Sequence, residues 1–127
     1  MRRAFLMTVL VVLALPRLAH GQVTGVWRGQ SICAWDRAGC VDETVVYYIS
    51  ATTKSGIASI RADKIVNGET VTMGMAEWNF DPDSHTLTWK MPRQTWLLKI
   101  DGDVIEGTLT LADKTVVRRM TLRRMGD

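Results

Sequence analysis

The sequence predicts an all-β protein, a single antiparallel up-and-down barrel of about eight strands within residues 22–127. Three observations lead to this prediction. Runs rich in β-branched and aromatic residues recur along the chain, turn signals separate them at short intervals, and no run shows the 3.6-residue period of an amphipathic helix. Sequential strands joined by tight hairpins form a meander, and closing the meander removes its exposed edges. A small open sheet or a sandwich is the alternative.

Seven turn signals separate the expected strands. Most contain Gly, Pro, Asp or Asn, the residues that tight turns favour, and they lie at 37–39, 55–56, 67–68, 81–83, 91–93, 101–103 and 112–114. The runs between them are the expected strands, at 26–33, 44–51, 57–66, 70–78, 86–91, 95–100, 104–111 and 115–124.

Residues 1–21 have the pattern of a secretory signal peptide. Two arginines follow Met1, residues 4–15 form an almost unbroken apolar run, and Ala19-His20-Gly21 is a small-x-small cleavage signal. The apolar run is too short to cross a bilayer and no second run follows it, so we expect no membrane span. We therefore expect a soluble domain at 22–127 that is periplasmic or secreted.

The charge balance argues against a nucleic-acid partner. Arg2, Arg3 and Arg17 are three of the 16 Lys and Arg residues, so residues 22–127 carry 13 cationic and 13 anionic side chains. Nucleic-acid binding depends on a basic surplus that displaces counterions. A neutral domain lacks that surplus.

The only two cysteines, Cys33 and Cys40, are separated by six residues. In an oxidising compartment an isolated pair of this kind predicts a disulfide that closes the loop 34–39. The other interpretations are a redox-active dithiol, which usually has tighter spacing, and half of a metal site, which would need further ligands.

Alternation along the strands assigns one apolar face to the barrel interior. We expect the following side chains on that face: Trp27, Met73, Met75, Trp89, Trp96 and Met120. An eight-stranded barrel is wide enough either to be filled by its own side chains or to hold one small ligand. The leading expectation for function is therefore the binding of a small apolar or amphipathic ligand by these residues.

Alternation places Arg118 on the inward face, between Val116 and Met120. A guanidinium inside a barrel needs a partner, because burying it alone costs several kcal/mol. Glu77 lies two residues after Met75, so alternation places it on the same inward face as Met73 and Met75. We therefore expect Glu77 to meet Arg118 in the interior, where the pair would orient the polar head of a ligand. A bulge at 118–119 that leaves both arginines outside is the alternative, as is a purely structural pair.

Trp35 and Arg37 lie in the expected disulfide loop and suggest a different function. A large aromatic residue on a rigid loop is a typical anchor for a protein partner. The alternative function is thus a protein-interaction module, such as an inhibitor of an envelope or extracellular enzyme. Trp35 could instead fold back over the barrel mouth.

Two resemblances support the barrel. Gly25-Val26-Trp27 resembles the Gly-x-Trp start of the calycin barrels, which include lipocalins, fatty-acid-binding proteins and avidins. In such barrels an arginine near the end of the last strand covers this tryptophan, and Arg124 is the residue that matches. Residues 27–33, 40–43, 62–68 and 107–109 resemble a group of small secreted bacterial β-barrel proteins with no assigned activity. This second resemblance implies export and one β domain.

No arrangement of residues indicates catalysis. His85 is the only histidine of residues 22–127, and it lies beside Asp83 and Ser84 in an expected turn. Asp101 and Asp103 flank a hairpin glycine but lack the spacing of a calcium loop. We therefore expect no enzymatic activity, no metal and no cofactor.

Overall fold

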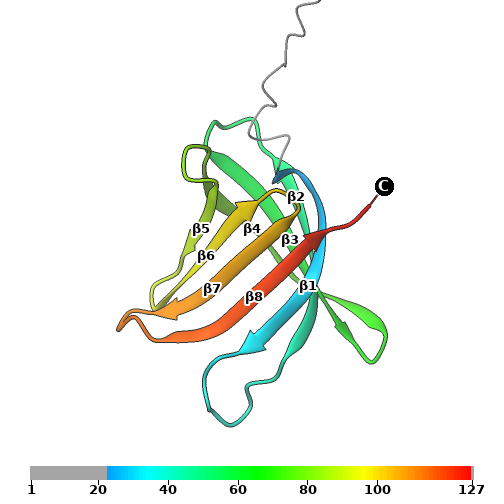
Figure 1. The fold of residues 1–127 in the computed structure, drawn as a ribbon, viewed down its shortest axis with the longest axis vertical. Coiled ribbons are helices and arrows are strands. Elements are labelled where there is room, and N and C mark those ends of the chain that lie inside the picture. The colour runs from blue at the N-terminus through cyan, green and yellow to red at the C-terminus, as the bar shows by residue number, and fades with distance from the viewer. Residues whose placement is uncertain (1–22, 127) are drawn as a thin grey trace, which may run out of the picture.

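Eight strands form one closed antiparallel barrel in the computed structural model, which describes residues 23–126 (Figure 1). The strands are β1 (Gly25–Cys33), β2 (Glu43–Ala51), β3 (Ile57–Val66), β4 (Glu69–Asp81), β5 (Thr86–Lys90), β6 (Gln94–Asp101), β7 (Val104–Leu111) and β8 (Val116–Arg124). Each strand pairs with the next, and β8 pairs with β1. The predicted fold class is confirmed. The expected signal peptide and its cleavage site lie outside the described residues.

The barrel closes at the seam between β1 and β8, where Trp27 is the register partner of Arg124. Trp27 is 0% exposed, and its indole Nε1 donates a hydrogen bond to the carbonyl of Val23 at 2.9 Å. The guanidinium carbon of Arg124 lies 4.3 Å from the centre of the Trp27 ring. Arg124 also donates hydrogen bonds to Asp103 Oδ1 at 3.1 Å and to the carbonyl of Thr24 at 2.9 Å. The prediction that Arg124 covers Trp27 is confirmed.

Gly29 allows β1 to approach β8 closely at this seam. A Cβ atom at position 29 would lie 1.8 Å from the carbonyl oxygen of Thr121 in β8. That oxygen belongs to the backbone and cannot move away without disturbing the ladder, so only glycine fits at this point.

Side chains fill one end of the barrel, next to the β2–β3, β4–β5 and β6–β7 turns. The buried apolar residues there include Trp27, Ile49, Phe80, Leu87, Leu98, Ile100, Ile105 and Leu122. The other end is surrounded by the β1–β2, β3–β4, β5–β6 and β7–β8 connections. Figure 1 shows the β3–β4 hairpin projecting from the barrel at this second end.

A bulge in β4 reverses the alternation that the sequence predicts for this strand. Ala62 pairs with Gly74 and Asp63 pairs with Thr72, so Met73 is an extra residue in β4. A bulge of this kind moves every later side chain to the opposite face. Glu77 is therefore exposed on the outer face and pairs with Ser59. The prediction that Glu77 faces the interior and meets Arg118 is wrong for this reason.

The predicted disulfide is present between Cys33 and Cys40, with an S–S distance of 2.03 Å. It closes the β1–β2 connection at one end of the barrel. The carboxylate of Asp42 accepts a hydrogen bond from the backbone N–H of Cys33 at 2.9 Å, which further fixes the loop.

We predict that Trp27→Ala lowers the free energy of unfolding by about 3–5 kcal/mol, because it removes a fully buried ring at the seam. Trp35→Ala, a matched change in the β1–β2 loop, should cost much less. Arg124→Ala should also cost more than Arg123→Ala, since only Arg124 covers the ring. Equal denaturation midpoints for the two tryptophan variants would contradict the importance of the seam.

We also predict that replacing both cysteines with serine destabilises the protein by roughly 2.5 kcal/mol, because an open loop gives the unfolded chain more conformational entropy. Thiol alkylation followed by mass measurement provides the accompanying check. The native protein should react only after reduction, and two reactive thiols without reductant would show that the bridge is not formed.

Candidate functional site

A cavity of about 470 Å³ occupies the end of the barrel that the core side chains leave open. Its volume lies within the range of small-molecule sites, roughly 300–1,000 Å³. The lining residues come from all eight strands, and β5 and β6 contribute Trp89, Gln94 and Trp96. The cavity exists because three inward or bulged positions carry small residues, namely Ala62, Gly74 and Ala76.

Three tryptophans form the apolar wall of this cavity. Trp78 from β4, Trp89 from β5 and Trp96 from β6 all line it. The ring centres of Trp78 and Trp89 lie 5.6 Å apart with an interplanar angle of 43°, a favourable tilted arrangement of aromatic rings. Trp96 is the register partner of Trp89, so the wall continues across neighbouring strands. This wall can pack against an apolar or aromatic ligand.

Arg118 provides a cationic group at the edge of the same cavity. Its Nη1 donates hydrogen bonds to the hydroxyl of Ser31 at 3.2 Å and to the carbonyl of Ser31 at 3.4 Å. Its Nη2 donates a hydrogen bond to the carbonyl of Val41 at 3.0 Å. These contacts hold the guanidinium between β1 and the disulfide loop. Because a guanidinium has five N–H donors, Arg118 retains capacity to bind an anionic or polar group.

Glu43 and Tyr47 complete the polar edge of the cavity. Glu43 lies 3.9 Å from the amino group of Lys64, so these two charges largely offset each other and leave the positive charge of Arg118. Burial raises the pKa of Tyr47 to about 12, with a smaller contribution in the same direction from the negative charge of Glu43. The nearby positive charge of Arg118 acts in the opposite direction. The Tyr47 hydroxyl is thus a neutral group at neutral pH.

Five of the residues predicted to contact a ligand line this cavity: Met73, Met75, Trp89, Trp96 and Arg118. Three do not. Trp27 lies in the filled end of the barrel, Met120 is buried in the core, and Glu77 is on the outer face. Met73 and Met75 reach the cavity at its mouth and remain 45% and 69% exposed, because the bulge turns this part of β4 outward.

Sequence reasoning missed Trp78, Tyr47 and Glu43. Trp78 and Phe80 alternate with Glu77, Asn79 and Asp81 at the C-terminal end of the strand. This local alternation indicates that Trp78 points inward. Tyr47 lies in a strand that is apolar on both faces, so alternation does not show which side chains of this strand point inward. Glu43 lies just after the disulfide loop, where no strand pattern assigns its face, but it opens β2 and lines the cavity.

The disulfide loop places Trp35 and Arg37 outside the cavity. The guanidinium carbon of Arg37 lies 4.4 Å from the centre of the half-buried Trp35 ring, a cation–π contact. The nearby apolar side chains of Ile32 and Val41 are 49% and 59% exposed.

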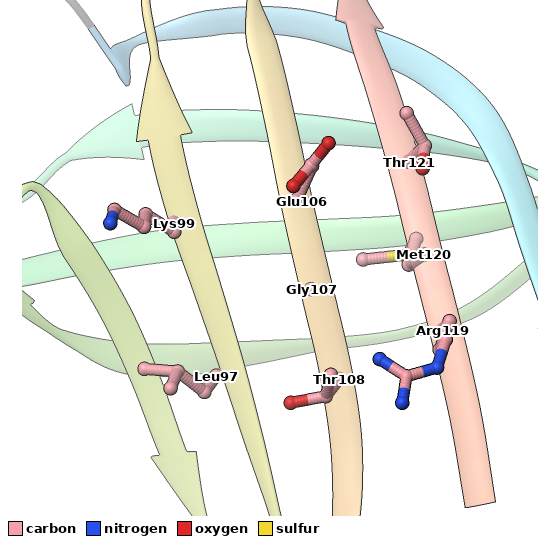
Figure 2. A pocket seen from close by; sticks show the side chains of 8 residues that line it. All are labelled: Leu97, Lys99, Glu106, Gly107, Thr108, Arg119, Met120 and Thr121. Carbon is pink, nitrogen blue, oxygen red and sulfur yellow. The ribbon is translucent and has the colours of Figure 1, made fainter. Parts of the chain in front are cut away.

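A second, shallower pocket of about 420 Å³ lies on the outer face of the barrel over β6, β7 and β8. Figure 2 shows Arg119 extending toward Thr108 on the neighbouring strand, while Lys99 and Glu106 lie further along. Gly107 lies in the middle of this pocket, and on its inner side the core residue Leu98 fills the space where a Cβ atom would lie. Lys99, Glu106 and Arg119 give this pocket charges of both signs, and Leu97 is the exposed apolar side chain beside them.

Across residues 23–126 no three His, Cys, Asp or Glu side chains come together in a way that could hold a metal ion. The same part of the chain contains no helix long and apolar enough to span a membrane. Comparison of the chain with protein-family models and with curated protein sequences finds no match.

The raised pKa of Tyr47 predicts a loss of stability at alkaline pH. An unfolded tyrosine ionises near pH 10.0, whereas folded Tyr47 keeps its proton until about pH 12. The unfolded state therefore loses its proton first, and stability falls as the pH rises from about 10 to 12, by up to roughly 3 kcal/mol.

Chemical denaturation of the native protein and of Tyr47→Phe between about pH 9 and pH 12 measures this effect. The difference between the two free energies of unfolding should be constant below pH 10.0, the pKa of unfolded tyrosine. Above that pH the native protein should lose stability relative to Tyr47→Phe. A difference that stays constant over the whole range would contradict burial of the hydroxyl.

Proposed function

We propose that this protein is a binding barrel that takes one small apolar or amphipathic ligand into the cavity at its open end. The observation that carries the proposal is a tryptophan wall and the guanidinium of Arg118 around about 470 Å³ of space, with the lining carboxylate of Glu43 paired to Lys64 outside the cavity. Small-molecule sites in proteins typically combine a mostly apolar lining with a few fixed polar groups.

The positions of the side chains favour a ligand with an anionic or strongly polar head. Trp78, Trp89 and Trp96 would pack against its apolar body, and Arg118 would donate hydrogen bonds to its head. Ser31 and the β1–β2 loop already hold the guanidinium in place, so binding costs little side-chain entropy. A carboxylate fits the planar donor set of an arginine especially well.

The place of action proposed is the periplasm or the extracellular space. The signal-peptide pattern of residues 1–21 supports export, and the Cys33–Cys40 disulfide fits an oxidising compartment. The contact between Trp27 and Arg124 supports a relationship to the calycin barrels. Barrels of that kind carry ligands. Binding without chemical conversion is the function proposed.

The disulfide loop supports a second candidate function, the binding of a protein partner. The bridge and the hydrogen bond from Cys33 to Asp42 make the loop rigid, and Trp35 with Arg37 forms an aromatic and cationic tip. The exposed side chains of Ile32 and Val41 extend the apolar surface beside that tip. Residues of these types are common at the centres of protein interfaces.

We predict that an amphipathic carboxylate changes the intrinsic tryptophan fluorescence and that Arg118→Met weakens its binding by about tenfold or more, as expected for the loss of a charge-assisted hydrogen bond. Arg119→Met is the matched control, because Arg119 is exposed on the outer face. Thermal unfolding of both variants separates lost binding from lost stability, since Arg118 also holds the loop.

A second variant tests the cavity itself. Ala62→Phe places a ring in the space beside the tryptophan wall, so it should abolish binding while the barrel remains folded. If a broad panel of fatty acids, aromatic acids and dyes leaves the fluorescence unchanged, or if Ala62→Phe binds as well as the native protein, ligand binding in this cavity is ruled out and the Trp35 loop becomes the leading candidate.

A further inference from the structure

Most of the edge of β4 that faces β5 has no strand partner. β4 pairs with β5 only at Asn79, Phe80 and Asp81, whereas its pairing with β3 continues along the strand to Glu69. Among the strand pairs formed within residues 23–126, the segment 69–78 therefore has a neighbour on one side only. Figure 1 shows this segment leading into the projecting β3–β4 hairpin.

Along this edge, every second residue directs its backbone N–H and C=O groups away from β3. The N–H of Phe80 donates to the carbonyl of Gly56, at 2.8 Å, so the hydrogen-bonding groups of Phe80 face the β3 side. Alternate residues of an antiparallel strand direct these groups to opposite neighbours. The pairing with β3 runs without a shift from Asn79 to Gly74, so Glu77 and Met75 direct their N–H and C=O groups toward the open edge. Such a row is a template for another strand.

The side chains beside this edge are apolar and open to solvent. Val71, Met73 and Met75 are 42%, 45% and 69% exposed. Met73 and Met75 also line the mouth of the cavity, next to the inward residue Trp78. A strand added here would therefore cover methionine side chains on one side and direct alternate side chains toward the cavity mouth.

The charge of β4 specifies the strand that fits. β4 contains Glu69, Glu77 and Asp81 and no lysine or arginine. Pairing with the same strand of a second copy would place acidic strands side by side, and like charges opposite each other are destabilising. An incoming strand with lysine or arginine on its outward positions instead complements Glu77.

We propose that the free edge of β4 binds an extended peptide segment of another protein, in which apolar residues alternate with basic ones. The backbone of the segment would exchange hydrogen bonds with Met75 and Glu77. Its apolar side chains would point toward the cavity mouth, and its basic side chains would lie on the outer face beside Met75 and the carboxylate of Glu77. This interaction goes beyond the small-molecule binding proposed above and does not depend on Arg118.

A fluorescently labelled peptide with blocked ends and alternating valine and lysine tests the proposal. Its anisotropy should rise on titration with the full domain at protein concentrations up to roughly 1 mM, the range of weak peptide binding. Amide hydrogen exchange at Met75 and Glu77 should slow in the complex, because these N–H groups become hydrogen-bonded. The same peptide methylated on its backbone nitrogens keeps its side chains but cannot pair, and it should not bind.

Charge reversal provides the matched comparison. Glu77→Lys should weaken binding of the valine–lysine peptide by about fivefold and should favour a valine–glutamate peptide instead. Glu106→Lys makes the same change on the outer face of β7 and should alter neither peptide. The proposal is overturned if the valine–lysine peptide does not bind, if backbone methylation or Glu77→Lys leaves its affinity unchanged, or if β4 instead pairs with a second copy of the chain to form a dimer.

Discussion

The closure of the barrel at the β1–β8 seam is the constraint on which the rest of the structure depends. Trp27 fills the interior beside this seam, and Arg124 covers its ring while its donors reach Asp103 and the backbone of Thr24. The cation therefore lies over an aromatic face while its Nε and Nη1 donate hydrogen bonds, which makes its partial burial favourable. These contacts join the first and last strands to the turn between β6 and β7. Without that closure, β1 and β8 would each present an unpaired edge.

Closure also explains why the two ends of the barrel differ. At the filled end, large side chains such as Phe80, Leu87 and Leu98 pack around Trp27 and exclude solvent. At the other end, the inward positions carry the small residues Ala62 and Ala76. Eight strands surround the interior at both ends, so these small side chains leave space unfilled. The same barrel therefore has a packed core at one end and a cavity at the other. The disulfide loop and Arg118 then fix the edge of that cavity from the β1 side.

The bulge at Met73 is the second local feature with wide consequences. One extra residue turns Glu77 outward and Trp78 inward, so it supplies an aromatic wall where an ion pair was expected. The bulge lies in the part of β4 that does not pair with β5, which leaves methionine side chains and backbone groups at the mouth of the cavity. The two proposed binding sites therefore adjoin at β4, one inside the barrel and one along its edge.

The sequence by itself determined the strand order, the disulfide, the seam between Trp27 and Arg124 and the inward position of Arg118. These features follow from alternation, turn residues, cysteine count and one short motif, all of which are local signals. Only the tertiary structure decided that Trp78, Tyr47 and Glu43 join Arg118 around a cavity and that Glu77, Trp27 and Met120 do not. Bulges carry no clear local signal, because the extra residue is defined by the pairing of two strands. The space left by small side chains likewise depends on which residues meet across the barrel.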